Sequence, residues 1–209
     1  NGIYLKAKPK DDAGTEYEAV LIGAQTWMAE NLNYDVEGSK CYNNNVGEDY
    51  CSLYGRLYDW ATAMVLAADC NDNNCTVQSK HKGICPEDWH IPSPADWDAL
   101  MAYVYNDNYE SGSAQDIVGK YLKAQEGWND YNSQSGNGED KYGFFALPGG
   151  YYSKYDAIFI NVGEVGRWHT TTYQYSANVD QYRMFYSNNR LTNGNDSKMN
   201  LISVRCIKD

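Results

Sequence analysis

The six cysteines are the residues of this chain whose spacing says most about their chemistry. They stand at positions 41, 51, 70, 75, 85 and 206, and none of them forms the double CxxC spacing of a structural zinc site. This even number predicts three disulfides, one of which joins Cys70 to Cys75 and closes a polar surface loop. A chain of 209 residues does not need disulfides to replace a core, so they indicate an oxidising, extracytoplasmic compartment.

The 3 histidines and 28 acidic residues are the other groups that could catalyse a reaction. His81, His90 and His169 share no helical spacing and therefore predict no common site. A pair of catalytic carboxylates cannot be selected by spacing from so many acids, which leaves glycoside hydrolysis as a weak hypothesis. The sequence therefore predicts no catalytic residues and a protein that is not an enzyme.

Two polar segments carry oxygen ligands of the kind that Ca²⁺ prefers. The first contains Asp69, Asn71, Asp72, Asn73 and Asn74, and the second contains Asn129, Asp130, Asn137, Glu139 and Asp140. Neither has EF-hand spacing, although Trp128-Asn129-Asp130 matches a tripeptide that carries calcium and sugar ligands in C-type lectins. Calcium is a hypothesis for both segments, the alternative is solvated polar turns, and no other cofactor is predicted.

Charge and hydropathy exclude two classes of partner. A formal net charge of −11 argues against binding to a nucleic-acid backbone. The longest apolar run, Ala63 to Ala68, is far shorter than the roughly 20 residues that span a bilayer, so no transmembrane helix is predicted. The length and the 43% hydrophobic content predict one folded domain over residues 1–209.

Three segments are predicted to be helical. The clearest runs from Pro94 to about Tyr105, because Ser93 can cap it and Asp96 occupies the capping-box position. Its apolar stripe is Trp97, Leu100, Met101 and Val104. A second helix is predicted from Leu53 to Ala68, where apolar residues recur every three or four positions, and a shorter one from Ala114 to Ala124.

The remaining segments predict strands and loops. Tyr17 to Ile22 and Gln25 to Met28 form a hairpin around Gly23-Ala24; further strands are Gly143 to Leu147, Arg167 to Tyr173, Tyr182 to Ser187 and Leu201 to Ile207. In the last strand Ile202, Val204 and Cys206 alternate with polar residues and so share one face. Gly127 to Gly143 is a long loop. Together these elements predict an α+β fold with antiparallel sheets.

Five blocks of the sequence resemble the Fibrobacter succinogenes major paralogous domain family. They are Ile22 to Leu32 (IGAQTWMAENL), Tyr54 to Tyr58 (YGRLY), Cys85-Pro86 with Trp89 to Ser93 (WHIPS), Gly143 to Gly150 (GFFALPGG) and Ser203 to Asp209 (SVRCIKD). The blocks follow one another in family order from about residue 17 to the end. One departure is Asp88, which stands where the family usually has Gly before Trp89.

The resemblance implies a secreted or surface-attached domain, often appended to bacterial lipoproteins, with a fold similar to C-type lectins and formylglycine-generating enzymes. We therefore expect two main helices packed on short antiparallel sheets, with long irregular loops. The formylglycine-generating relatives use a reactive cysteine pair and copper. Here the resemblance implies that Cys206 bridges to Cys85, which with Cys41–Cys51 and Cys70–Cys75 leaves no spare pair.

The Tyr and Asn content of the second half predicts a binding surface, because Tyr offers rigid amphipathic rings and Asn offers adaptable hydrogen bonds. We place it on the loops from Gly127 to Tyr142 and from Tyr173 to Asn200, which show no apolar period. The residues expected to touch ligand are Trp128, Tyr131, Tyr142, Tyr175, Asn188, Asn189 and Asn193. The alternative for any one Tyr is that its ring packs in the core with the hydroxyl at the surface.

These observations predict an extracytoplasmic, non-catalytic binding or adhesion module that recognises a polysaccharide or a cell-surface glycan. The alternative is a protein–protein display or assembly domain on the bacterial surface, and the third hypothesis is an enzyme. The ligand itself is not predicted.

Overall fold

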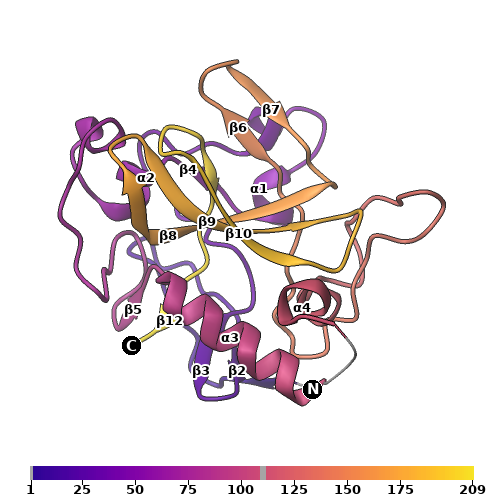
Figure 1. The fold of residues 1–209 in the computed structure, drawn as a ribbon. Coiled ribbons are helices and arrows are strands. Elements are labelled where there is room, and N and C mark those ends of the chain that lie inside the picture. The colour runs from indigo at the N-terminus through magenta and orange to yellow at the C-terminus, as the bar shows by residue number, and fades with distance from the viewer. Residues whose placement is uncertain (1, 109–111) are drawn as a thin grey trace.

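The computed structural model describes residues 2–108 and 112–209 and contains three sheets (Figure 1). The first sheet has the order β1 (Ile3–Tyr4), β2 (Ala19–Ile22), β3 (Gln25–Met28), β12 (Ile207–Lys208) and β5 (Trp89–His90). The second has the order β10 (Leu191–Ser197), β9 (Asn178–Phe185), β8 (Val165–Tyr175), β11 (Ile202–Ser203) and β4 (Leu57–Tyr58). The third pairs β6 (Tyr151–Ser153) with β7 (Ile158–Ile160).

The described residues also form four α-helices and two 3-10 turns. They are α1 (Tyr50–Tyr54), α2 (Trp60–Met64), α3 (Pro94–Asp107) and α4 (Ala114–Leu122), with 3-10 turns η1 (Tyr42–Asn45) and η2 (Ala68–Asn71). Strand pairs are antiparallel except β11 with β8. The predicted α+β class is therefore confirmed. Among the described residues, no helix is long and apolar enough to cross a bilayer.

Helix α3 forms as its local sequence predicts. The Ser93 hydroxyl accepts a hydrogen bond from the Asp96 backbone N–H at 3.3 Å, and the Asp96 carboxylate accepts one from the Ser93 N–H at 2.8 Å. This reciprocal capping box satisfies two backbone donors at the start of the helix. The predicted stripe of Trp97, Leu100, Met101 and Val104 is buried. The β2–β3 hairpin and helix α4 are confirmed as well, within two residues of the predicted bounds.

The helix predicted from Leu53 to Ala68 is wrong. The chain forms α1, then β4, then α2, and the break falls at Gly55, whose φ is 74°. A Cβ at Gly55 would lie 2.8 Å from both the Asn31 Cβ and the Leu32 carbonyl oxygen. Gly55 therefore packs closely against Asn31 and Leu32, which are distant in sequence, and this contact interrupts a segment whose apolar spacing suits a helix. Leu53 remains exposed.

The end of the chain differs from the single strand predicted from Leu201 to Ile207. Its residues leave β11 of the second sheet and enter β12 of the first, and every side chain from Leu201 to Ile207 is buried. Ser203 and Arg205, which alternate with apolar residues, are thus inside and not in solvent. A segment that passes between two sheets has no solvent face, so alternation does not indicate which side chains are exposed.

The predicted loop from Tyr173 to Asn200 is also corrected, because most of it is the β9–β10 hairpin. Strand β10 was missed since its sequence, LTNGNDS, is polar and lies at the edge of the sheet. Gly143 to Leu147 forms no strand beyond an isolated bridge between Lys123 and Ala146. The loop from Gly127 to Gly143 is irregular, as predicted.

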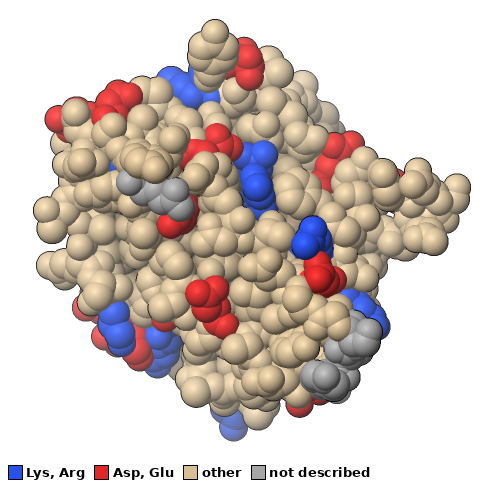
Figure 2. Space-filling view, in the orientation of Figure 1, with Lys and Arg blue, Asp and Glu red and all other residues tan. Residues whose placement is uncertain are grey.

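Two apolar clusters fill the interior. One lies between α3, α4 and the sheets and is centred on Trp27, Trp97, Phe144 and Trp168; the other surrounds α2 and contains the Cys85–Cys206 disulfide. All three predicted disulfides, Cys41–Cys51, Cys70–Cys75 and Cys85–Cys206, are confirmed. They support an oxidising compartment. On the face shown in Figure 2 most of the surface is uncharged, and charges lie singly or in small groups.

Candidate functional site

Two of the predicted ligand residues are buried, so the expectation that their rings lie exposed on the loops is wrong. Trp128 is 4% exposed, and its indole N–H donates to the Ala146 carbonyl at 2.9 Å. Tyr142 is 5% exposed, and its hydroxyl donates to the Asp107 carboxylate at 2.5 Å. Both rings belong to the core although their segment has no apolar period.

The other five are exposed and lie in three places. Tyr131, Asn188 and Asn189 line one small cleft of about 110 Å³, where the Tyr131 ring packs edge-on against Tyr186. Tyr175 is exposed at the opposite end of the β8–β9 pair, since Val165 faces Phe185 whereas Tyr175 faces Asn178. Asn193 is exposed on β10, opposite Tyr182. Their contact with a ligand stays a prediction.

A buried lysine holds this small cleft together. The Lys123 ammonium donates to the carbonyls of Gly136, Phe185 and Asn188 at 2.6, 3.3 and 3.0 Å. It also lies 4.9 Å from the centre of the Trp128 ring. Burial lowers the pKa of Lys123 from 10.5 to about 8. The two loops of the predicted site are thus fixed to one internal cation.

The pKa of Lys123 predicts a pH dependence of stability. Between about pH 8 and 10.5 the unfolded chain keeps this proton while the folded chain has lost it, so this group makes stability rise with pH in that window. We expect the free energy of unfolding of the wild type, minus that of Lys123→Met, to increase by on the order of 3 kcal/mol from pH 7 to pH 10.5. Urea titrations at stepwise pH measure this difference. A flat difference for Lys123→Met would contradict the assigned pKa.

A second buried lysine occupies the first predicted calcium segment. The Lys198 ammonium donates to the Cys70 and Asn73 carbonyls at 3.1 and 2.9 Å and lies over the Trp60 and Tyr173 rings. The Asn71 side chain is used internally, because it accepts from the Ala61 N–H and donates to Asp59. In the part of the chain that the structure describes, no three His, Cys, Asp or Glu side chains converge as metal ligands. Calcium stays a hypothesis for both segments.

The histidines do not meet. His81 contacts the Met64 carbonyl, His169 contacts the Tyr58 carbonyl, and His90 contacts the Asp209 carboxylate, at 2.7, 2.7 and 2.6 Å. Burial lowers the pKa of His169 to about 4, so this ring is neutral at pH 7. Each histidine side chain thus contacts a different part of the fold.

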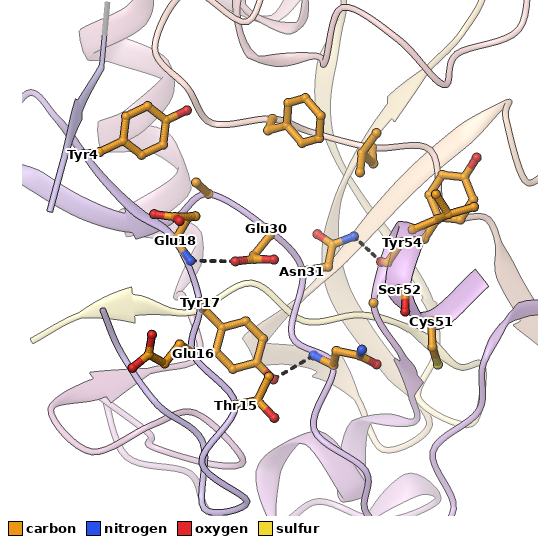
Figure 3. A pocket seen from close by; sticks show the side chains of 16 residues that line it. Tyr4, Thr15, Glu16, Tyr17, Glu18, Glu30, Asn31, Cys51, Ser52 and Tyr54 are labelled. Carbon is orange, nitrogen blue, oxygen red and sulfur yellow. Dashed lines mark hydrogen bonds between the residues drawn. The ribbon is translucent and has the colours of Figure 1, made fainter. Parts of the chain in front are cut away.

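A deeper cleft of about 360 Å³ lies between the first sheet and α1 (Figure 3). Its acidic lining consists of Glu16, Glu18 and Glu30; its aromatic and apolar lining includes Tyr4, Leu53 and Tyr54. Figure 3 shows Glu18 and Glu30 close together, with Tyr54 across the cavity. Tyr4 and Leu53 are 52% and 50% exposed, so part of the apolar lining is open to solvent.

The acidic side chains are fixed as hydrogen-bond acceptors. Glu30 accepts the Glu18 backbone N–H at 2.6 Å, Glu18 is paired with Lys8, and Glu16 is paired with Lys10 at 2.8 Å. The hydrogen bond from Lys10 lowers the pKa of Glu16, which favours its charged form. A carboxylate that is held in its charged form can accept hydrogen bonds from a ligand. It is poorly suited to act as a general acid, which must donate a proton.

The floor of the cleft is rigid. Asn31 donates to the Tyr54 carbonyl at 2.8 Å, and its own carbonyl oxygen accepts from Trp168 at 2.9 Å and from Arg205 at 2.7 Å. Arg205 is fully buried and also donates to the carbonyls of Phe144 and Phe145. Burial lowers its pKa to about 9. The network ties the cleft to both sheets and leaves Asn31 no donor for a ligand.

One acceptor in the cleft lining lacks a donor. The side-chain oxygen of Asn33 is buried and makes no hydrogen bond with the described residues, while the Asn33 N–H donates to the Tyr17 hydroxyl at 3.1 Å. Tyr17 in turn donates to Asp11 at 2.6 Å. The Asn33 oxygen is closed off from solvent, so the acceptors that the cleft offers to a ligand are the carboxylates of Glu16, Glu18 and Glu30, which suit a ligand that brings donors.

Sequence reasoning missed this cleft. Its residues come from three segments, 15–18, 29–33 and 51–55, with further contacts from Tyr4 and Phe145. The available signal was Glu30 within the Ile22 to Leu32 block, and the alternation of Lys8, Lys10, Glu16 and Glu18 near the start of the chain. Neither feature distinguishes a cleft from an exposed surface.

A comparison with known protein families identifies the family of this chain. The model of the Fibrobacter succinogenes major domain matches residues 20–208. The chain belongs to this family. No curated protein and no solved structure matches the chain significantly.

The blocks that carry the family likeness are structural in this molecule. Asn31 and Arg205 form the network under the cleft, Gly55 allows the approach to Leu32, and Cys206 is disulfide-bonded. Asp88, at the position where Gly is usual, has a φ of 62°, a left-handed conformation that Gly adopts without strain. Membership of the family thus accounts for the scaffold and says little about the ligand.

Proposed function

We propose that this domain is an extracytoplasmic, non-catalytic module that binds a neutral polysaccharide or cell-surface glycan in the acidic cleft. The observation that carries the proposal is a cleft lined both by three glutamates and by aromatic and apolar side chains, among them Tyr4, Leu53 and Tyr54. A sugar matches both, because its hydroxyls donate to carboxylates and its C–H face packs against aromatic rings. The formal net charge of −11 disfavours an acidic glycan by charge repulsion.

The proposal extends to the type of fold and to location. A small number of helices on short sheets, three disulfides and the family likeness support a C-type lectin-like fold on a secreted or surface-attached protein. The proposed site differs from the loops predicted from sequence, since Trp128 and Tyr142 are core residues.

Glu30→Gln tests the proposal, because it removes a charge while an amide oxygen can still accept the Glu18 N–H. Loss of charged hydrogen bonds to sugar hydroxyls should weaken glycan binding roughly tenfold or more. A glycan array and pull-down on insoluble cellulose and xylan identify the ligand, and calorimetry measures its affinity. Glu87→Gln is the matched control, because Glu87 is 88% exposed and lies outside the cleft.

Three outcomes would contradict the proposal. Unchanged affinity of Glu30→Gln would place the ligand elsewhere. Binding only to a cationic protein partner, with a steep loss of affinity at high salt, would favour the display or assembly function. Release of reducing sugar from the bound glycan would make the domain an enzyme.

A further inference from the structure

Five aromatic rings form a continuous row beside the cleft. Tyr54, Tyr50, Tyr42, Phe159 and Tyr152 follow one another with ring-centre separations of 6.3, 5.3, 5.2 and 4.9 Å. All five side chains are half-buried, so each presents part of its ring to solvent. The row was not predicted, because its members come from three separate segments of the chain.

Covalent and backbone links fix the row in place. Tyr42 in η1 and Tyr50 in α1 are adjacent in sequence to Cys41 and Cys51, which form a disulfide. Tyr152 on β6 and Phe159 on β7 are direct partners in the third sheet. In Figure 1 this sheet stands at the upper end of the molecule near α1. The rings therefore need little reorganisation to receive a ligand.

Each end of the row opens into a hollow. Tyr54 lines the acidic cleft, whereas Tyr42, Tyr152 and Phe159 line a second hollow of about 540 Å³. Lys40, Asn43 and Asn44 add polar groups there, and the Lys40 ammonium lies 5.3 Å from the centre of the Tyr152 ring. Asn43 and Asn44 have φ values of 50° and 51°, a left-handed conformation that Asn adopts more readily than most residues.

From this arrangement we infer that the ligand is a linear polysaccharide whose chain runs from the acidic cleft along the ring row into the second hollow. The inference rests on the proposed function and adds that several consecutive sugar units are bound. Rings separated by about the size of one sugar ring offer repeated apolar contacts to a chain, and a single sugar could use only one end. Hydroxyls at the sugar edges can meet the carboxylates at one end and the amides of Asn43 and Asn44 at the other.

The test is calorimetry of neutral linear oligosaccharides of increasing length, from disaccharide to octasaccharide, taken from the polysaccharide that the domain binds. We expect the affinity to rise with length and then to level off once the chain spans both hollows. Tyr152→Ala should leave the affinity for the disaccharide unchanged and lower the affinity for the longest chain by about fivefold or more. Tyr155→Ala is the matched control, because Tyr155 is on the same hairpin, is 97% exposed and is outside the row.

The outcomes separate the two proposals. Equal affinity for all lengths, with a loss in Glu30→Gln, would overturn the inference and leave the proposed function standing. An equal loss in Tyr152→Ala and Tyr155→Ala would also overturn it, since the hairpin as a whole and not the row would then be responsible. Absence of binding at every length would overturn both. Melting temperatures of the variants equal to that of the wild type establish that the affinities refer to folded protein.

Discussion

Replacement of Trp97 by Ala is expected to lower the free energy of unfolding by about 3 to 5 kcal/mol, the range for deleting a fully buried aromatic side chain. Trp97 is 0% exposed and packs against Trp27, Tyr182, Trp168 and Phe144 at ring-centre distances of 4.9 to 5.9 Å. α3 and both large sheets meet at this ring, so Trp97→Ala would leave a cavity between them. Surrounding side chains that are held by these elements cannot easily move to fill it. Urea denaturation of the oxidised protein measures the loss.

Two variants define the cause of this loss. The Trp97 indole N–H makes no hydrogen bond with the described residues, so Trp97→Phe removes volume alone and should cost clearly less than Trp97→Ala. Tyr103→Ala removes a 42% exposed ring from the same helix and should also cost much less. Losses of equal size at Trp97 and Tyr103 would show that α3 does not bury the Trp97 face.

Removal of the Cys85–Cys206 disulfide should be similarly costly. The two cysteines are 121 residues apart in sequence, and a bridge that closes such a long loop restricts the unfolded chain by about 5 kcal/mol in the loop-entropy model. Replacement of both cysteines by Ala avoids a free thiol. Thermal and chemical denaturation under non-reducing conditions measure the change.

The Cys70–Cys75 pair supplies the matched comparison, since its cysteines are only 5 residues apart. The same model assigns about 2 kcal/mol to this short loop. Equal losses for the two double variants would mean that native-state strain or packing, and not the restriction of the unfolded chain, determines what these disulfides contribute.

The sequence predicts those parts of the fold whose signals are local. Helix α3 carries its cap, its Pro and its apolar stripe within 14 residues, and the β2–β3 hairpin carries its turn between its strands. The helix predicted from Leu53 fails because Gly55 is required by contact with Asn31 and Leu32, which are distant in sequence. The prediction of one final strand is wrong because both faces of this segment are covered. Its alternating pattern therefore does not separate buried from exposed side chains.

The site was less predictable than the fold. Trp128 seemed free because its loop has no apolar period, yet its ring is buried beside Lys123, whose ammonium satisfies the Gly136 carbonyl of that loop inside the protein. The acidic cleft combines Glu18 and Glu30 with Tyr54, which only the tertiary structure brings together. Composition could not indicate which Tyr rings are exposed, since Tyr17, Tyr58 and Tyr182 are buried, or which rings lie next to one another.

The two internal lysines have a consequence for how this domain can vary. Lys123 and Lys198 hold their loops through the main-chain oxygens of Gly136, Phe185, Asn188, Cys70 and Asn73. Because every amino acid carries such an oxygen, these hydrogen bonds do not themselves select a side chain, although Gly136 leaves no room for a Cβ and Cys70 is needed for its disulfide. The side chains of Asn73 and Asn188, which are exposed, can therefore be replaced while both loops keep their main-chain hydrogen bonds to the lysines, so the surface at these two positions can change without a change in the interior.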